Sequence, residues 1–298
     1  MIKLSILIPT YEQECYRLVE KLHRQAEQIA DMEYEIIVSD DATTTSQIKG
    51  VNAKVSTLSN CRLITQQRNI GRSANRNLLA KTASHPWLLF IDSHMNVKDE
   101  RFLQRYCEVA EHDVVYYGGY VIPEKFTVEF KHNLRAKYER HCMSKQTLEV
   151  RQQRPYDNFH TANFMIPRKT ALQFLFNETI TQYGYEDVLY GITLQQNNIP
   201  IVHIDNPALF DTFESNERFL AKTEQAMQTL RNNHMHMFEY SALLRCHQRC
   251  RRLHITPVLS LWHRLFVKME KKNLCGKHPS VTLFQLYKLG LYNQLSEK

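Results

Sequence analysis

A carboxylate and an imidazole stand two residues apart in the segment Asp92-Ser93-His94, directly after the apolar run Trp87–Ile91. Five apolar residues in succession predict a short strand that is buried on both faces, as in parallel sheets. Ligands of open α/β sheets bind outside the carboxyl ends of the strands. Asp92 and His94 are therefore candidates to hold one divalent cation at such a strand end.

A second pair of acids, Glu186 and Asp187, lies among aromatic residues in the segment 183–191. Apolar residues follow the pair at helical spacing, which predicts a helix that begins at the acids. A helix N-terminus favours the ionised form of a nearby carboxylate. We therefore expect two charged carboxylates at the start of this helix.

The first ~95 residues alternate between strand and helix patterns. Such alternation predicts an α/β fold with a mainly parallel sheet and right-handed crossovers. Strands are expected over residues 4–8, 34–39, 61–65 and 87–91, and helices over 12–30 and 73–82. Only eight residues are Gly, and no Gly-x-Gly-x-x-Gly or Walker-type loop is present. Phosphates bound to this sheet would therefore need the metal at Asp92 and His94.

Later segments extend the sheet, and the chain then changes character near Ser215. Residues 113–123, 160–168 and 199–207 predict further strands, and 129–150 a basic helix or lid. Helical patterns predominate from Ser215 onward. We expect a sheet domain over 1–214 and a basic helical extension over 215–298.

Residues 258–272 predict an amphipathic helix. Trp262 lies on its apolar face, and Arg264, Lys268, Lys271 and Lys272 form the other face. This pattern is typical of helices that lie in a membrane interface. A helix packed on the main domain, with its basic face in solvent, is the alternative. No apolar stretch is long enough to cross a bilayer.

The formal charge of +7 and the pI of about 9.0 favour an anionic partner. The basic residues concentrate only near the C-terminus and show no recognisable docking motif, which disfavours nucleic acid. Seven cysteines are scattered without a paired framework. That usage indicates a reducing cytoplasm as the compartment.

Five segments in this order resemble the family 2 glycosyltransferases, which use nucleotide-sugar donors, have the GT-A fold and mostly invert the anomeric centre. The resemblance covers roughly the sheet domain. The matching segments are Ser5–Tyr11 (opening strand), Ile37–Thr43 (Asp-Asp-Gly-Ser position), Asn69–Asn77 (Asn-x-Gly…Ala-Arg-Asn), Phe90–His94 (Asp-x-Asp position) and Tyr185–Asp187 (Glu-Asp motif).

The resemblance implies a role for each candidate residue. Asp187 would be the catalytic base, and Glu186 would contact hydroxyls of the acceptor or donor; an acid that serves only the helix dipole is the alternative for Asp187. Ser93 is included with the donor-binding residues, and Asn163 would lie near the sugar. The residues implied to contact uracil and ribose are Thr10, Tyr11, Glu12, Asp41 and Arg76.

The chain departs from the family pattern at two positions. Ala42 replaces the glycine after Asp41, and His94 replaces the second aspartate of Asp-x-Asp. An Asp-x-His version with a further histidine downstream occurs in related GT-A enzymes, the polypeptide N-acetylgalactosaminyltransferases. By that analogy His203 is the third ligand, although a histidine satisfied within a strand is the alternative. Mixed carboxylate and imidazole ligation suits Mn²⁺, with Mg²⁺ as the second choice.

These implications predict an inverting, metal-assisted transferase that moves a sugar, with UDP as the expected carrier, to a hydroxyl of a glycan or lipid-linked acceptor. The role would be in bacterial surface polysaccharide synthesis, in the cytoplasm or peripherally on the inner face of the membrane. A nucleotidylyltransferase is disfavoured because Pro9-Thr10-Tyr11-Glu12 is not a Gly-rich basic loop. A non-catalytic GT-A-like protein that acts through its basic tail is the remaining alternative.

Overall fold

The computed structural model describes residues 2–110 and 114–297. The chain divides into two compact units, which are described one at a time. Unit 1 comprises residues 1–123, 145–181 and 190–212, and unit 2 comprises 124–144, 182–189 and 213–298. Unit 1 thus ends close to the boundary expected at 214. Two segments expected in the sheet domain, 124–144 and 182–189, instead belong to the helical unit.

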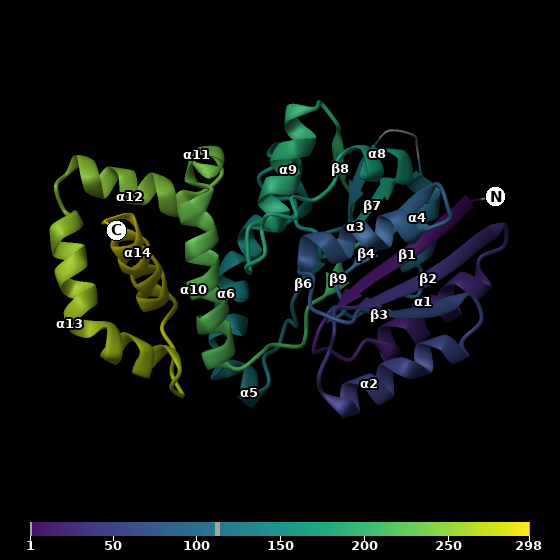
Figure 1. Ribbon diagram of the computed structural model, residues 1–298, viewed down its shortest axis with the longest axis horizontal. Helices are drawn as coiled ribbons and strands as arrows, with labels where there is room; N and C mark the ends of the chain where they lie inside the picture. Colours follow the sequence, from purple (N-terminus) through teal and green to yellow (C-terminus); the bar gives the residue numbers. More distant parts are fainter. Residues whose placement is uncertain (1, 111–113, 298) are drawn as a thin grey trace. The chain divides into compact units, whose positions relative to one another are not determined.

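Unit 1 is built on a mixed, mainly parallel sheet, as expected (Figure 1). In the described residues seven strands form this sheet in the order β3-β2-β1-β4-β7-β5-β8, and β7 runs antiparallel to both of its neighbours. A separate parallel pair joins β6 to β9. The strands are β1 (Ile2–Thr10), β2 (Met32–Asp40), β3 (Cys61–Thr65), β4 (Trp87–Ile91), β5 (Val115–Tyr117), β6 (Tyr120–Val121), β7 (Asn163–Pro167), β8 (Ile201–His203) and β9 (Ala208–Leu209).

Helices flank this sheet, and their apolar side chains pack against those of the strands to form the core of unit 1. The expected helices over 12–30 and 73–82 are present as α1 and α3. The expected strand over 113–123 is split into β5 and β6, and its first residue, Asp113, lies outside the described residues. The helices lying wholly in unit 1 are α1 (Tyr16–Gln28), α2 (Ser46–Ala53), η1 (Lys54–Thr57), α3 (Arg72–Thr82), α4 (Phe102–Val109), α7 (Leu148–Gln153) and α8 (Arg168–Gln173).

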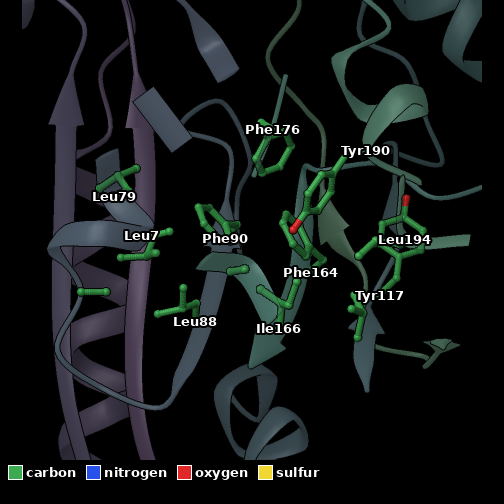
Figure 2. Packing of buried hydrophobic residues seen from close by; sticks show 14 of the residues in the cluster. Leu7, Leu79, Leu88, Phe90, Tyr117, Phe164, Ile166, Phe176, Tyr190 and Leu194 are labelled. Carbon is green, nitrogen blue, oxygen red and sulfur yellow. The ribbon is translucent and has the colours of Figure 1, made fainter. Parts of the chain in front are cut away.

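One core cluster of unit 1 joins one face of the sheet to α3, α8 and the second part of α9 (Glu186–Gln196). Figure 2 shows side chains of this cluster meeting from separate strands and helices. The rings of Phe90 and Phe164, from neighbouring strands, stack with centroids 4.9 Å apart. Phe176 and Tyr190 stack at 3.9 Å. Burial of these large rings holds β4 and β7 in place, and the candidate site lies at the ends of those strands.

Unit 2 is helical. Leu134, Phe219 and Phe284 come from three separate helices and lie in one buried cluster, which ties residues 124–144 to the C-terminal helices. No helix of the described residues is long and apolar enough to span a membrane. Besides the start of α9, the helices are α5 (Val128–Lys131), α6 (Leu134–Cys142), η2 (Met143–Lys145, which ends in unit 1), α10 (Asn216–Asn232), α11 (His234–Met237), α12 (Ala242–Arg252), α13 (Thr256–Leu274) and α14 (Val281–Glu297).

Candidate active site

Four strand ends meet at one edge of the sheet in unit 1. Because β1, β2 and β4 are parallel neighbours, their carboxyl ends lie at the same edge, with Thr10 opposite Asp40. β7 is antiparallel, so it begins at this edge, with Asn163 opposite Ile91. The residues predicted after three separate strands are therefore gathered along one edge.

Asp92, the first residue after β4, is held by Arg76 of α3. An Arg76 Nη2 atom lies 2.7 Å from Asp92 Oδ1, and the two side chains are 2% and 14% exposed. Burial alone would raise the pKa of Asp92. The positive charges of Arg76, His94 and Arg72 outweigh this effect and lower the pKa below its usual range. Asp92 is therefore an ionised carboxylate at the sheet edge.

His94 follows Asp92 in a tight turn, in which the Met95 amide donates to the Asp92 carbonyl oxygen over 2.9 Å. The imidazole is half-buried and lies edge-on to the Phe210 ring, with centroids 4.9 Å apart. Phe210 follows β9, and this segment is attached by the bridge between Asn96 and Leu209. The β9 segment thus limits the positions available to the His94 ring.

Asp41 shapes the loop that precedes α3. Its carboxylate accepts hydrogen bonds from the amides of Ile70 (2.7 Å) and Gly71 (3.0 Å), and Asn69 Nδ2 donates to its carbonyl oxygen (3.2 Å). Gly71 has a φ of +87°, a conformation that favours glycine. Burial raises the pKa of Asp41, although the two amide hydrogen bonds act in the opposite direction. Asp41 therefore positions this loop, and both of its carboxylate oxygens are already engaged.

Glu12, in the loop after β1, also positions a neighbouring loop through hydrogen bonds to its carboxylate. Its carboxylate accepts from the Thr44 amide (2.6 Å), the Thr44 hydroxyl (2.7 Å) and the Thr45 hydroxyl (2.6 Å). The hydrogen bonds from Thr45 and Thr44 lower the pKa of Glu12 to about 2. These contacts connect the loop after β1 to the loop after β2. Tyr11 beside it is 48% exposed, whereas Thr10 is buried and its hydroxyl donates to the Gln13 carbonyl oxygen.

Ala42 adopts a φ of +63° in the loop after β2. A residue with a Cβ atom is disfavoured there by about 1–2 kcal/mol, whereas glycine is not. The structure therefore gives a physical reason for the glycine that the Asp-Asp-Gly-Ser pattern has at this position.

Asn163 reaches the predicted edge, but its side chain is fully buried and engaged. Its Oδ1 accepts from the Tyr106 hydroxyl over 2.7 Å, and its Nδ2 donates to the carbonyl oxygens of Gly119 (2.8 Å) and Asn206 (2.9 Å). These bonds join the start of β7 to the segments after β5 and β8. The predicted position of Asn163 near the sugar stays a prediction, and in the structure this side chain supports the backbone of the site.

His203 is not brought together with Asp92 and His94. Three strand spacings separate β8 from β4, about 14 Å in a sheet. Both ring nitrogens are also occupied: Arg151 Nη1 donates to Nδ1 (3.2 Å), and Nε2 donates to the Pro155 carbonyl oxygen (2.9 Å). Across the described residues, no three His, Cys, Asp or Glu side chains form a group able to hold a metal. The structure therefore does not bring His203 together with Asp92 and His94, and the predicted set of three metal ligands is wrong in this chain.

Arg151 is a structural residue that no sequence pattern predicted. Its buried guanidinium donates to the carbonyl oxygens of Tyr117 (3.3 Å) and Ile204 (3.2 Å) as well as to His203, which ties the ends of β5 and β8 together. The sequence carries no signal for this role, because the pattern around Arg151 predicts only a basic helix. Phe210 was also missed, although an aromatic residue soon after a strand end is a visible signal.

Glu186 and Asp187 open helix α9, as predicted, and belong to unit 2. Gly184 and Tyr185 before them both have positive φ values, which turn the chain into the helix. Glu186 is 6% exposed, and Asp187 is half-buried. Asp187 is therefore the more accessible carboxylate of the two.

The family model described as Glycosyl transferase family 2 matches residues 5–176. The match includes β1 from Ser5 onward, β2, the Asp41 loop, Arg76, Asp92 and His94, and it spans more than half of the chain. The chain belongs to glycosyl transferase family 2. Family 2 membership confirms the predicted class, whereas the family match does not test the Asp-x-His interpretation of residues 92–94. No curated protein sequence matches the chain significantly.

Solved structures show that this family 2 glycosyltransferase has the GT-A fold. The mannosyltransferase PcManGT from Pyrobaculum calidifontis, in complex with GDP-Man and Mn²⁺, has a TM-score of 0.59 at 13% identity, over 99% of this chain and 88% of that one. S. aureus TarS 1–349 in complex with UDP-GlcNAc has a TM-score of 0.54 at 17% identity, over 99% and 91%.

A longer TarS structure has a TM-score of 0.52 at 19% identity, over 81% of this chain and 44% of the TarS chain. The present chain thus spans less than half of that protein. At these identities the likeness establishes the fold.

Proposed function

We propose that this chain is an inverting glycosyltransferase that moves a sugar from a UDP-linked donor to a hydroxyl of a glycan or lipid-linked acceptor. The observation that carries the proposal is the pair Asp92 and His94 at the carboxyl end of β4, beside the ends of β1 and β2. Family membership supports glycosyl transfer, and the sheet edge is where ligands of α/β folds bind.

The residues at this edge fit a divalent cation of the Mn²⁺ type, with Mg²⁺ as the alternative. Asp92 supplies an ionised carboxylate and His94 an imidazole, a mixed ligand set that suits such ions. When bound, the cation neutralises charge that develops on the diphosphate leaving group. Arg76 keeps the carboxylate of Asp92 in position, so we assign Arg76 a positioning role instead of the predicted contact with uracil.

The loops after β1 and β2 would hold the nucleoside. Glu12 joins these two loops by hydrogen bonds from Thr44 and Thr45. Asp41 joins the loop after β2 to the loop before α3 through the amides of Ile70 and Gly71. Tyr11 is the exposed aromatic ring of the predicted set, so we assign it the contact with the base. Thr10 and Ser93 are buried, and we propose that they act through their backbone groups.

Asp187 would accept the proton of the acceptor hydroxyl as that oxygen attacks the anomeric carbon. Its place in the first turn of α9 favours an ionised carboxylate, which a base requires. Glu186 is more buried, and it would contact substrate hydroxyls. The choice of UDP is supported by TarS in complex with UDP-GlcNAc, whereas PcManGT is in complex with GDP-Man. The transferred unit would be a hexosyl or N-acetylhexosaminyl group.

A second candidate is a non-catalytic GT-A-like protein. It is favoured by one observation, that Asp92 is paired with Arg76 and belongs to no group of three metal-binding side chains in the part of the chain that is described. Such a protein would bind a nucleotide sugar without transferring it.

The test measures nucleotide release across a panel of UDP- and GDP-sugars, with Mn²⁺, with Mg²⁺ and with a chelator. We expect metal-dependent UDP release from one donor, lost in Asp92→Ala and reduced at least a hundredfold in Asp187→Asn. Glu20→Gln, which neutralises an exposed acid on α1, is the matched control and should retain activity. Donor binding without release in the wild type would favour the non-catalytic candidate, and no binding would contradict both.

A further inference from the structure

Helix α13 turns an apolar stripe toward solvent. Five large apolar side chains on it are exposed, between 42% and 67%: Val258, Leu261, Trp262, Leu265 and Met269. Leu261 and Trp262 are adjacent, and the other three lie three or four residues from one of them or from each other, so that all five lie on one side of the helix. The opposite face carries His263, Glu270 and Leu274, which are buried within unit 2. Helices on the surface of soluble proteins normally bury the apolar stripe, so this arrangement is reversed.

A buried polar group holds α13 in this orientation. Glu270 is 2% exposed, and its carboxylate accepts from Trp262 Nε1 (3.0 Å) and lies 2.9 Å from His263 Nδ1. A Cβ atom at Gly290 of α14 would lie 2.9 Å from the His263 Cβ atom, so the two helices are in close contact there. Rotation of α13 to bury the stripe would break these contacts and leave a buried carboxylate unpaired. The exposed position of the Trp262 ring is therefore built into the unit.

Positive charge is concentrated around this stripe. Residues 240–296 contain ten Lys and Arg and one acid, the buried Glu270. The formal net charge of this segment is therefore larger than the +7 of the whole chain. Arg264, Lys268 and Lys272 lie along one side of the apolar stripe at helical spacing. Among the described residues these three make no ion pair, whereas Lys271 is paired with Glu224 at 2.7 Å. The basic side chains remain available for an external anion.

A shallow, open pocket lies at the C-terminal end of the stripe. It has a volume of about 440 Å³ and is lined by Met269, Lys272, Asn273, Gly276, Lys277 and His278. Lys272 and Lys277 are donors that suit a phosphate group, whereas the Asn273 amide already donates to the His278 carbonyl oxygen over 3.3 Å. Met269 continues the apolar stripe to the edge of the pocket. Apolar contact and phosphate-binding groups therefore adjoin each other.

We propose that this face of α13 docks on an anionic phospholipid bilayer, with the helix lying in the plane of the interface and a lipid phosphate in the pocket. Helices that lie in a membrane interface typically combine an apolar face containing tryptophan with flanking basic side chains, as this exposed stripe does. The positive charge complements anionic head groups. The proposal goes beyond the proposed glycosyl transfer and stands without it, because docking requires no catalytic residue.

Binding is tested by co-sedimentation of the full chain with vesicles of phosphatidylglycerol and phosphatidylcholine in equal parts, and with vesicles of phosphatidylcholine alone. We expect binding to the anionic vesicles, weakened by added salt. Arg264→Gln and Lys268→Gln should each lower the partition coefficient about fivefold. Leu265→Gln should lower it at least tenfold, since one leucine leaves the lipid phase. Val128→Gln, at a residue of α5 that is 72% exposed, is the matched control and should bind as the wild type does.

Fluorescence gives a second readout. Trp87 is 6% exposed and Trp262 is 42% exposed, so a blue shift of emission on adding anionic vesicles reports Trp262. Absence of both co-sedimentation and blue shift would overturn the proposal. So would a concentration-dependent dimer that Leu265→Gln abolishes, because the stripe would then bind a second copy of the chain. Binding of duplex DNA with no binding to vesicles would also contradict it. Circular dichroism of each variant verifies folding, and none of these readouts depends on transferase activity.

Discussion

At the scale of single residues, the candidate site depends on side chains that hold other side chains. Arg76 is the main example, because it is buried and its guanidinium is engaged with Asp92. Loss of one partner from such a pair leaves the other charge buried without compensation. Residues of this kind influence both stability and the ionisation of the carboxylate with which they pair.

We predict that Arg76→Met lowers the free energy of unfolding by about 3 kcal/mol and raises the pKa of Asp92, because its main compensating charge is removed. Urea denaturation measures the first effect. The matched control is Arg24→Met, which breaks the exposed pair with Glu100 and should cost less than about 1 kcal/mol. Equal losses in the two variants would show that the Arg76–Asp92 pair is no stronger than a surface pair.

His203 predicts a specific dependence of stability on pH. Burial, together with the charge of Arg151, lowers the pKa of His203 to about 4 in the folded state, against about 6.5 in an unfolded chain. Between these values the unfolded chain binds a proton that the folded chain does not bind. The contribution of His203 to the free energy of unfolding is therefore fully present above pH 6.5. It declines as the pH falls toward 4, by up to about 3 kcal/mol.

The measurement is denaturation at a series of pH values for the wild type and for His203→Gln, which keeps a polar side chain in β8. The variant should show a smaller decline between pH 6.5 and 4. An identical decline in both proteins would assign the acid sensitivity to other histidines.

At the scale of elements, tight backbone contacts join the segments that carry the site. A Cβ atom at Gly118, just after β5, would lie 2.5 Å from the Asn163 Nδ2 atom and 2.5 Å from the Tyr106 hydroxyl. These are the groups that attach the start of β7 to its neighbours. Their positions allow no additional atom.

We predict that Gly118→Ala destabilises the protein by about 1–3 kcal/mol, because a close-packed contact is forced apart. The matched control is Gly50→Ala in α2, where an added Cβ atom meets nothing within 4 Å. Alanine is the better helix former, so this control should stabilise the protein by about 0.5–1 kcal/mol. Thermal or urea unfolding measures both, and a neutral Gly118→Ala would contradict the packing described for this segment.

The loop after β2 gives a second prediction at this scale. Ala42→Gly should raise the free energy of unfolding by up to about 1 kcal/mol, because relief of the unfavourable φ exceeds the added flexibility of the unfolded chain. Asn60→Gly, at a φ of +57°, is the control and should gain less, since asparagine tolerates this conformation. A loss of stability in Ala42→Gly would contradict the assignment of strain to this turn.

The sequence predicted the strands with continuous apolar runs, the helices between them and the polar residues after the strand ends. These features depend on local pattern, and Asp92, His94, Asp41 and Glu186 are placed as that pattern indicates. The order of β7, β5 and β8 depends on long-range pairing, which leaves no local signal. His203 was therefore assigned to the wrong neighbourhood, and the partners of Asn163 and Arg76 could not be foreseen.

At the scale of the whole molecule, the helical unit is not a simple C-terminal extension. Leu134 and Tyr138 pack against residues of α10 and α14, and Tyr185 packs beside Met227 and Leu230. A boundary at 214 would separate these side chains from the partners that bury them. The unit is continuous in space but not in sequence.

We predict that a chain truncated to residues 1–214 is less soluble than the full chain and is cleaved rapidly within residues 124–144. The physical reason is that Leu134 and Tyr138 lose the C-terminal partners that bury them and become exposed in the truncated chain. Limited proteolysis with mass spectrometry measures the cleavage sites, and a chain of residues 1–296 is the control. Equal resistance of the two chains would indicate that residues 124–144 are stable without the C-terminal helices.

The interleaving of the two units sets an order of events during synthesis. β9, which pairs with β6, comprises residues 208–209, so the last strand of unit 1 leaves the ribosome before α10 does. Leu134 leaves the ribosome early, but its cluster includes Phe284 and Tyr287, about 150 residues later. Throughout that interval the apolar face of α6 has no partner from α14. We therefore expect the helical unit, and not the sheet unit, to be the part of the nascent chain that exposes apolar surface for longest.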